Sequence, residues 1–179
     1  MSTTDVENVL AAMAEKFGSV DFQPAPLMAR ADKSRQQMHV RVGPDMLLEV
    51  MRFLRHDDRC RFNQLCDLTC VDYLEFPAAT ERYGVTYSLL STELNHRLWV
   101  KCFVNDPDPE VPSVTSIWKG ADWPEREVWD LFGVRFSDHP DLRRIMTWEG
   151  YEGHPLRKDY PLHGRGERED YRRVERESA

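Results

Sequence analysis

Four cysteines are the residues that could do the most distinctive chemistry in this 179-residue sequence if they acted together. Cys60, Cys66 and Cys70 are separated by five and by three residues, and Cys102 lies further along the chain. Zinc and iron–sulfur sites usually contain two cysteines separated by two residues and a fourth ligand nearby, so this spacing does not predict a metal site. Cys66 and Cys70 fall on the same face of a strand-like segment, where cysteine commonly packs as a small apolar side chain. We therefore predict buried, reduced thiols, and no metal or cofactor in this chain.

Three acidic residues, Glu125, Glu127 and Asp130, could in principle act as general acids or bases. Acidic residues are ordinary in the first turns of a helix, and no nucleophile, oxyanion donor or Gly-rich loop accompanies these three. His139 and His154 each stand directly before a proline, in a segment that looks extended. Such a segment does not supply the rigid pocket that a catalytic histidine needs. We expect no catalytic residues, and we expect both histidines to form hydrogen bonds at an interface.

A basic set accompanies the histidines. Arg143, Arg144, Arg157 and Lys158 stand among acidic neighbours, and the simplest interpretation is a solvated surface whose ion pairs contribute about 0–1 kcal/mol each. The segment around them favours a stronger interpretation, because its extended backbone and its apolar side chains have no core of their own to pack against. These apolar side chains are Leu142, Ile145, Leu156 and Tyr160. Arginine pairs well with carboxylates and carbonyl groups, so we predict that this segment docks on a partner protein.

Charge and hydropathy exclude several classes of protein. The chain has 24 Lys and Arg against 31 Asp and Glu, a net charge of −7, which does not supply the basic surface that nucleic acids or anionic lipids attract. No apolar run approaches the roughly 20 residues that a membrane-spanning helix needs. The first residues lack the pattern of a secretory or mitochondrial leader. We therefore expect a cytoplasmic protein that has no nucleic-acid partner and reaches a membrane only through other proteins.

The elements that must position these residues can be predicted from hydrophobic periodicity. Helices are expected over 4–17, 44–55 and 122–132, and strands over 38–42, 62–73, 83–90 and 98–104. Asp122 can cap the last helix, Pro124 suits its first turn and Gly133 ends it. Successive strands with short connections favour an antiparallel sheet. The predicted fold class is therefore α+β, with an antiparallel sheet and helices packed on one face of it.

The sequence changes character after the last predicted helix. It becomes dense in charge and is interrupted by Pro140, Pro155 and Pro161, which are too close together for a long helix. Few of its residues could build a separate core. We predict a domain over residues 1–136, followed by an extended partner-binding tail over residues 137–179.

The order of residues in and after the last helix resembles the signature of a known family. Two motifs carry the resemblance, and the second lies at the family's usual distance after the first. The first motif comprises Glu125-Arg126-Glu127, Asp130-Leu131-Phe132-Gly133, His139 and Arg143-Arg144-Ile145-Met146, and the second runs Glu152-Gly153-His154-Pro155-Leu156-Arg157-Lys158-Asp159-Tyr160-Pro161. Together they resemble the 30-kDa (C) subunit family of the respiratory NADH:quinone oxidoreductase, complex I, most specifically from about Trp118 to Pro161.

The resemblance implies a structural, non-catalytic subunit of the peripheral arm, which supports the quinone-reducing (D) subunit and contacts other hydrophilic subunits through the motif residues. It places FMN, iron–sulfur clusters and quinone in partner subunits, and the chain on the cytoplasmic side of the inner membrane, or the matrix side if mitochondrial. The whole complex would pass electrons from NADH to quinone and translocate ions. Two alternatives stay open. One is the equivalent subunit of an energy-converting hydrogenase or ferredoxin-driven complex, and the other is a stand-alone redox metalloprotein built on the cysteines.

Overall fold

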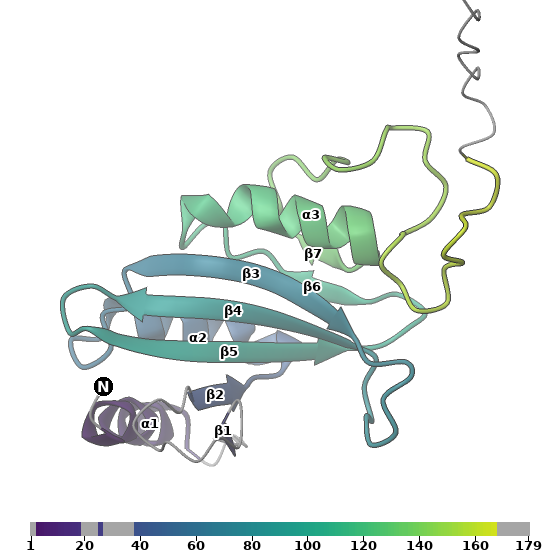
Figure 1. Cartoon of the computed structure of the whole chain (residues 1–179). Helices are drawn as coiled ribbons and strands as arrows, with labels where there is room; N and C mark the ends of the chain where they lie inside the picture. The colour runs from purple at the N-terminus through teal and green to yellow at the C-terminus, as the bar shows by residue number, and fades with distance from the viewer. Residues whose placement is uncertain (1–2, 19–24, 27–37, 168–179) are drawn as a thin grey trace, which may run out of the picture.

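The computed structural model describes residues 3–18, 25–26 and 38–167 (Figure 1). The helices are α1 (Thr3–Phe17), α2 (Pro44–His56), the short 3-10 helix η2 (Lys119–Ala121) and α3 (Asp122–Phe132). The strands are β1 (Ala25–Pro26), β2 (Met38–Arg41), β3 (Gln64–Asp72), β4 (Tyr83–Ser91), β5 (His96–Val104), β6 (Glu110–Pro112) and β7 (Arg135–Ser137). Within the described residues, no helix has the length and apolar character needed to cross a bilayer.

The main sheet has the strand order β1-β2-β5-β4-β3, and β6 and β7 form a separate parallel pair. The predicted antiparallel arrangement holds for β3, β4 and β5, but β2 pairs with β5 in parallel, so the sheet as a whole is mixed. The reason lies in α2, which carries the chain from β2 to the far edge of the sheet. From that edge the β3–β4–β5 meander returns to β2 with β5 running in the same direction as β2. The α+β fold class is confirmed.

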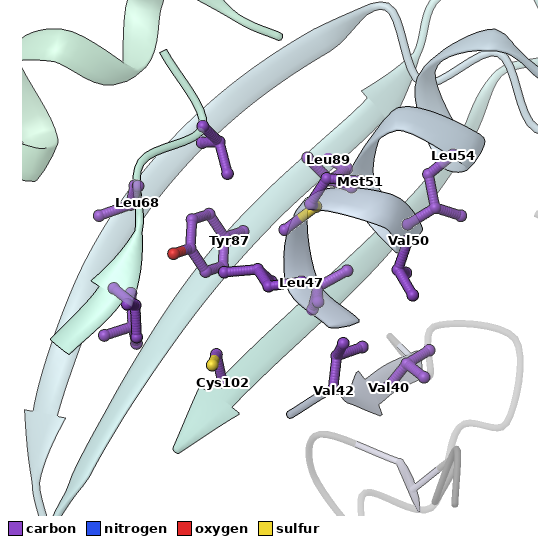
Figure 2. Packing of buried hydrophobic residues seen from close by; sticks show 14 of the residues in the cluster. Val40, Val42, Leu47, Val50, Met51, Leu54, Leu68, Tyr87, Leu89 and Cys102 are labelled. Atoms are coloured by element: carbon purple, nitrogen blue, oxygen red, sulfur yellow. The ribbon is translucent and has the colours of Figure 1, made fainter. Parts of the chain in front are cut away.

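Helix α2 supplies much of the apolar surface that covers one face of the sheet. It begins at Pro44, whose fixed φ suits the first turn of a helix. In Figure 2 the buried side chains of α2 lie over the face of the sheet to which β4 contributes Tyr87 and Leu89. Burial of each such side chain is worth about 1.5–3 kcal/mol, so this contact is a principal source of the domain's stability. Four side chains of α2 at helical spacing are fully buried: Leu47, Val50, Met51 and Leu54.

Strand β5 shows that the core lies on one side of the sheet. Leu98, Val100 and Cys102 alternate along it and are buried, whereas Trp99 and Lys101 between them are only half-buried. In Figure 1 α2 lies behind the three long strands, and α3 runs alongside β3. The prediction that helices pack on one face of the sheet is confirmed.

The cysteines do not all pack as predicted. Cys60, Cys70 and Cys102 are buried, and burial raises the pKa of each thiol to about 12, so they are protonated at neutral pH. Cys66 is exposed, because a β-bulge between Leu65 and Asp67 breaks the alternation that would have placed it on the same face as Cys70. In the described part of the chain, no three His, Cys, Asp or Glu side chains are grouped so that they could hold a metal ion.

The ends of α3 are defined by its flanking backbone. The prediction that Asp122 caps the helix is wrong, because η2 leads directly into α3 and Asp122 is already its first helical residue, its N–H bonded to Lys119 O. Gly133 ends the helix as predicted. It adopts the left-handed conformation with φ of 79°, and its N–H bonds to the carbonyl oxygen of Trp129 at 2.9 Å.

Candidate partner interface

The first family motif is centred on Asp130 of α3, a carboxylate that is completely buried. One of its oxygens, Oδ2, accepts hydrogen bonds from the backbone N–H groups of Ile145, Met146 and Thr147, at 3.0, 2.7 and 2.9 Å. The other, Oδ1, accepts from Thr147 Oγ1 at 2.5 Å and from Arg144 at 2.6 Å. Burial alone would raise the pKa of Asp130, but these donors outweigh it and lower the pKa to about 2. Asp130 is therefore ionised at neutral pH, and its carboxylate holds the chain after β7 against α3.

The second motif attaches to the same turn of α3. His154 Nδ1 donates to the carbonyl oxygen of Asp130 at 2.9 Å, and the N–H of Leu156 donates to Leu131 O at 3.0 Å. Burial lowers the pKa of His154, so the ring is neutral at neutral pH. Gly133 permits this approach, because a Cβ atom built at that position would lie 2.6 Å from His154 Cδ2. The glycine thus ends the helix and also makes room for the histidine ring.

A second buried carboxylate, Asp72 at the end of β3, binds the chain further on. It accepts hydrogen bonds from the N–H of Lys158 at 2.9 Å and from Arg82 at 3.1 and 3.2 Å. Burial acts to raise the pKa of Asp72, but the hydrogen bonds from Arg82 and from Lys158 N–H, among others, bring it below its usual value. Arg82 also pairs with Asp159 at 2.7 Å. Strand β3 is therefore tied to a segment 86 residues later in the sequence.

The ion pairs at this end of the sheet extend to Arg157. Its guanidinium donates to Asp106 at 2.6 Å and lies over the ring of Tyr83, 5.1 Å from the centroid. Arg82 contacts the same ring, at 4.9 Å. Together with Asp130, these contacts dock residues 143–160 on the chain's own domain; Figure 1 shows the same part of the chain forming a long loop beside α3.

Glu125 and His139 meet near the start of α3. The carboxyl of Glu125 is fully buried and accepts hydrogen bonds from Ser113 Oγ at 2.6 Å and from Val114 N at 2.7 Å. Burial raises the pKa of Glu125 to about 7, partly opposed by those two bonds. The imidazole of His139 is also buried, with Nε2 3.1 Å from Asp122 O. Both histidines of the motifs thus form hydrogen bonds within this chain.

Two charged residues of the first motif lie at the surface. Glu127 is exposed, and Arg143 is 66% exposed and pairs with exposed Asp141. Arg126 is nearly buried, with its Nε donating to Arg143 O at 3.2 Å and its guanidinium over the ring of Trp123. The charged residues of the motif thus divide between the surface and the packed side of α3.

The uncharged motif residues have intermediate burial. Leu131 and Phe132 at the end of α3 are half-buried, and so is Pro155 in the second motif. The hydroxyl of Tyr160 donates to Glu167. These residues therefore contact this chain with one side and leave part of their surface open.

Exposed apolar side chains gather on this part of the chain. Five large ones are at least 45% exposed: Trp123, Met146, Trp148, Leu156 and Leu162. Large apolar side chains exposed on one segment are typical of a protein contact. We define the docking surface as α3 together with residues 138–162. The predicted boundary at residue 137, and a role for the motif residues at a partner, stay predictions.

Several residues that hold this surface in place were not among the predicted site residues. Asp72, Arg82, Asp106, Ser113 and Thr147 lie outside the two motifs or between their members. The sequence offered one weak signal, because Asp72 stands between Val71 and Tyr73 in a strand-like run, and a carboxylate buried there would need a partner. Nothing in the sequence indicated that its partner would be a residue 86 positions later.

Comparison with known proteins gives a consistent result. Residues 40–166 match the family described as the respiratory-chain NADH dehydrogenase 30-kDa subunit. The chain is 49% identical over 135 residues to NADH-ubiquinone oxidoreductase subunit 9 of Reclinomonas americana, covering 75% of this chain and 64% of that protein. It is 48% identical over 130 residues to the probable mitochondrial NADH-ubiquinone oxidoreductase 30.4 kDa subunit of Candida maltosa, covering 73% of this chain and 46% of that protein. The chain thus spans less than two thirds of the length of these relatives.

A solved structure supports the same relationship. The trypsin-resistant fragment (1–134) of Nqo5 superposes with a TM-score of 0.63 at 31% sequence identity, covering 77% of this chain and 99% of that fragment. The likeness therefore extends to the three-dimensional arrangement of the domain as well as to the sequence motifs.

Proposed function

Because the chain belongs to the 30-kDa subunit family of respiratory-chain NADH dehydrogenases, we propose that it is a non-catalytic structural subunit of the peripheral arm of an NADH:quinone oxidoreductase. In this proposal the docking surface binds the quinone-reducing (D) subunit. FMN, iron–sulfur clusters and quinone belong to the partner subunits. The chain reaches the cytoplasmic side of the membrane only through them.

The observation that carries the proposal is the way the docking surface is built. Two buried carboxylates, Asp130 and Asp72, fix the backbone of an otherwise irregular segment, so its apolar side chains are held outward without a regular element beneath them. Met146 illustrates this, since its N–H bonds to Asp130 while its side chain is 63% exposed. A surface fixed before binding avoids the ordering cost that a flexible segment would incur on association.

The basic residues divide into two groups under this proposal. Arg144 and Arg157 are committed to carboxylates of this chain, Asp130 and Asp106, and would support the surface from beneath. Arg143 lies at the exposed rim, where a charge chiefly influences the rate and orientation of association. Under this proposal the neighbouring residues Arg143 and Arg144 therefore have different roles.

Co-purification tests the proposal. The tagged full-length chain, expressed in the organism that encodes it, should be recovered from detergent-solubilised membranes together with the quinone-reducing subunit, identified by mass spectrometry. Recovery with hydrogenase subunits instead would favour the alternative complex. Recovery of the folded chain with no other subunit would contradict the proposal.

A pair of matched variants locates the contact. Met146→Asp places a charge in the docking surface and should reduce the recovery of the quinone-reducing partner at least about tenfold, since burying an unpaired charge at an interface is costly. Leu94→Asp introduces the same charge at an exposed residue in the β4–β5 turn, away from the docking surface, and should leave recovery unchanged. Equal recovery of the partner with both variants would place the contact elsewhere.

A further inference from the structure

Glu125 is a buried carboxyl group that the proposed docking does not use. Two donors, Ser113 Oγ and Val114 N, contact its oxygens, and its side chain has no exposed surface. Among the ion pairs of the described residues, Glu125 has no lysine or arginine partner, and the nearest basic group is His139, with Nε2 3.8 Å from Oε2. Asp130, on the same helix, has five donors that include an arginine. One buried acid of α3 therefore has a cationic partner, and the other has none.

In the described part of the chain, the titratable groups that face Glu125 come from three elements. Asp122 lies on α3 itself, His139 on the segment after β7, and Tyr87 on β4. Asp122 is an acid whose charge opposes ionisation of Glu125, and burial raises the pKa of Tyr87 far above neutral, so its hydroxyl stays uncharged. The charge state of His139 therefore decides whether Glu125 has a counter-ion.

The hydrogen bonds of His139 use both ring nitrogens and need only one ring proton. Nδ1 accepts the N–H of Asp141 at 3.0 Å, so it carries no proton. Nε2 lies 3.1 Å from the carbonyl oxygen of Asp122 and must then be the protonated nitrogen that donates to it. A second proton on the ring would break the bond from Asp141. In this hydrogen-bonding arrangement His139 does not supply a cation for Glu125.

We propose that Glu125 is a proton-binding site: its buried carboxyl is protonated in the folded chain, and loss of that proton weakens the contact between α3 and the turn after β6. The protonated carboxyl can donate to Ser113 Oγ and still accept from Val114 N. The ionised carboxylate keeps two donors but lies in a buried site without a cation, which is unfavourable. The pKa of about 7 that burial gives this group agrees with the geometry.

The direction of the pH effect follows from the two pKa values of Glu125. In the unfolded chain the carboxyl has its ordinary value of 4.5, and in the folded chain the value is about 7. As pH rises between these values, the unfolded chain loses its proton first, so this group makes folding progressively less favourable. From about pH 5 to about pH 8 the folding equilibrium constant should fall on the order of 10²-fold because of Glu125 alone.

The Glu125→Gln variant of the full chain isolates this contribution. Glutamine keeps the shape and both hydrogen bonds but cannot ionise, so the ratio of wild-type to variant folding constants should decline on the order of 10²-fold from about pH 5 to about pH 8. Comparison with this variant cancels other titrations in the same range, such as that of His154, whose lowered pKa acts in the opposite direction. Parallel stability profiles for the two proteins would overturn the proposal.

Two further measurements keep the test decisive. In the His139→Gln variant the decline should persist, and its disappearance there would assign the titration to the histidine and overturn the proposal. Infrared spectra of the wild-type chain should show the C=O stretch of a buried protonated carboxyl at about pH 6, which fades as pH rises. This second readout does not depend on whether Glu125→Gln folds, and absence of the band at that pH would also overturn the proposal.

Discussion

Replacement of Asp130 by Asn should release the chain after β7 from α3. The carboxylate accepts five hydrogen bonds, three from backbone N–H groups on Oδ2 and two on Oδ1 from Thr147 and Arg144. Asparagine has a single acceptor oxygen, and its NH₂ group would face either the three N–H groups or the Arg144 and Thr147 donors. Neither orientation can satisfy both sets of donors.

The stability lost in Asp130→Asn can be estimated from the burial of Asp130 and Arg144. Asp130 has no exposed surface and the side chain of Arg144 is 13% exposed, so the variant would leave a largely buried guanidinium without its carboxylate. Removing one partner of a buried pair typically costs about 3–5 kcal/mol. The depressed pKa gives a related figure, because a fall from 3.8 to about 2 corresponds to about 2 kcal/mol of stability. That contribution is present above about pH 4 and is lost as pH falls through about 2.

The assay is urea denaturation combined with hydrogen exchange. We expect the free energy of unfolding of Asp130→Asn to fall by about 3–5 kcal/mol, and the amides of Ile145, Met146 and Thr147 to lose protection while the central strands keep theirs. Asp141→Asn is the matched control, because its pair with Arg143 is exposed and should contribute within about 1 kcal/mol. A variant at Asp130 that is as stable as this control would refute the reasoning.

Two other substitutions test separate features of the fold. Gly133→Ala should destabilise the chain by about 2–4 kcal/mol in thermal unfolding, since a left-handed φ of 79° is unfavourable for alanine and the added Cβ would displace His154. Gly120→Ala is the control, because a Cβ there meets no atom within 4 Å, and it should cost less than about 1 kcal/mol in the same assay. Tyr87→Phe should leave stability within about 1 kcal/mol or raise it, because in the described part of the chain the buried Tyr87 hydroxyl has no hydrogen-bond partner. A loss above about 2 kcal/mol in urea denaturation would mean that this hydroxyl does have a partner.

Much of the local structure could be predicted from the sequence because it depends on nearby residues. The helix predicted over 44–55 is observed as Pro44–His56, and the strand predicted over 83–90 as Tyr83–Ser91. Gly133 was predicted to end α3, and it does so with the left-handed conformation that glycine adopts most readily. Periodicity and terminating residues are encoded within a few positions, so these predictions needed no knowledge of the fold.

The predictions that failed depended on backbone detail or on long-range pairing. Cys66 was expected to be buried, but a single extra residue at a bulge reverses the alternation of side chains along β3. The sheet was expected to be antiparallel, but β2 pairs in parallel with β5, and α2, β3 and β4 lie between these two strands in the sequence. Strand propensity does not distinguish parallel from antiparallel partners, so only the path of the chain decides the direction.

The motif residues also show what the sequence determined and what only the tertiary structure decided. By itself the sequence determined that α3 and the chain after it are dense in acidic and basic residues, and that the chain after α3 lacks an apolar core of its own. Only the tertiary structure decided that Asp130 pairs with Arg144 beneath the docking surface while neighbouring Arg143 stays at its rim. It also brought Lys158 to Asp72, across 86 residues. Pattern and charge are properties of the chain, whereas burial and partnership depend on which distant segments folding brings together.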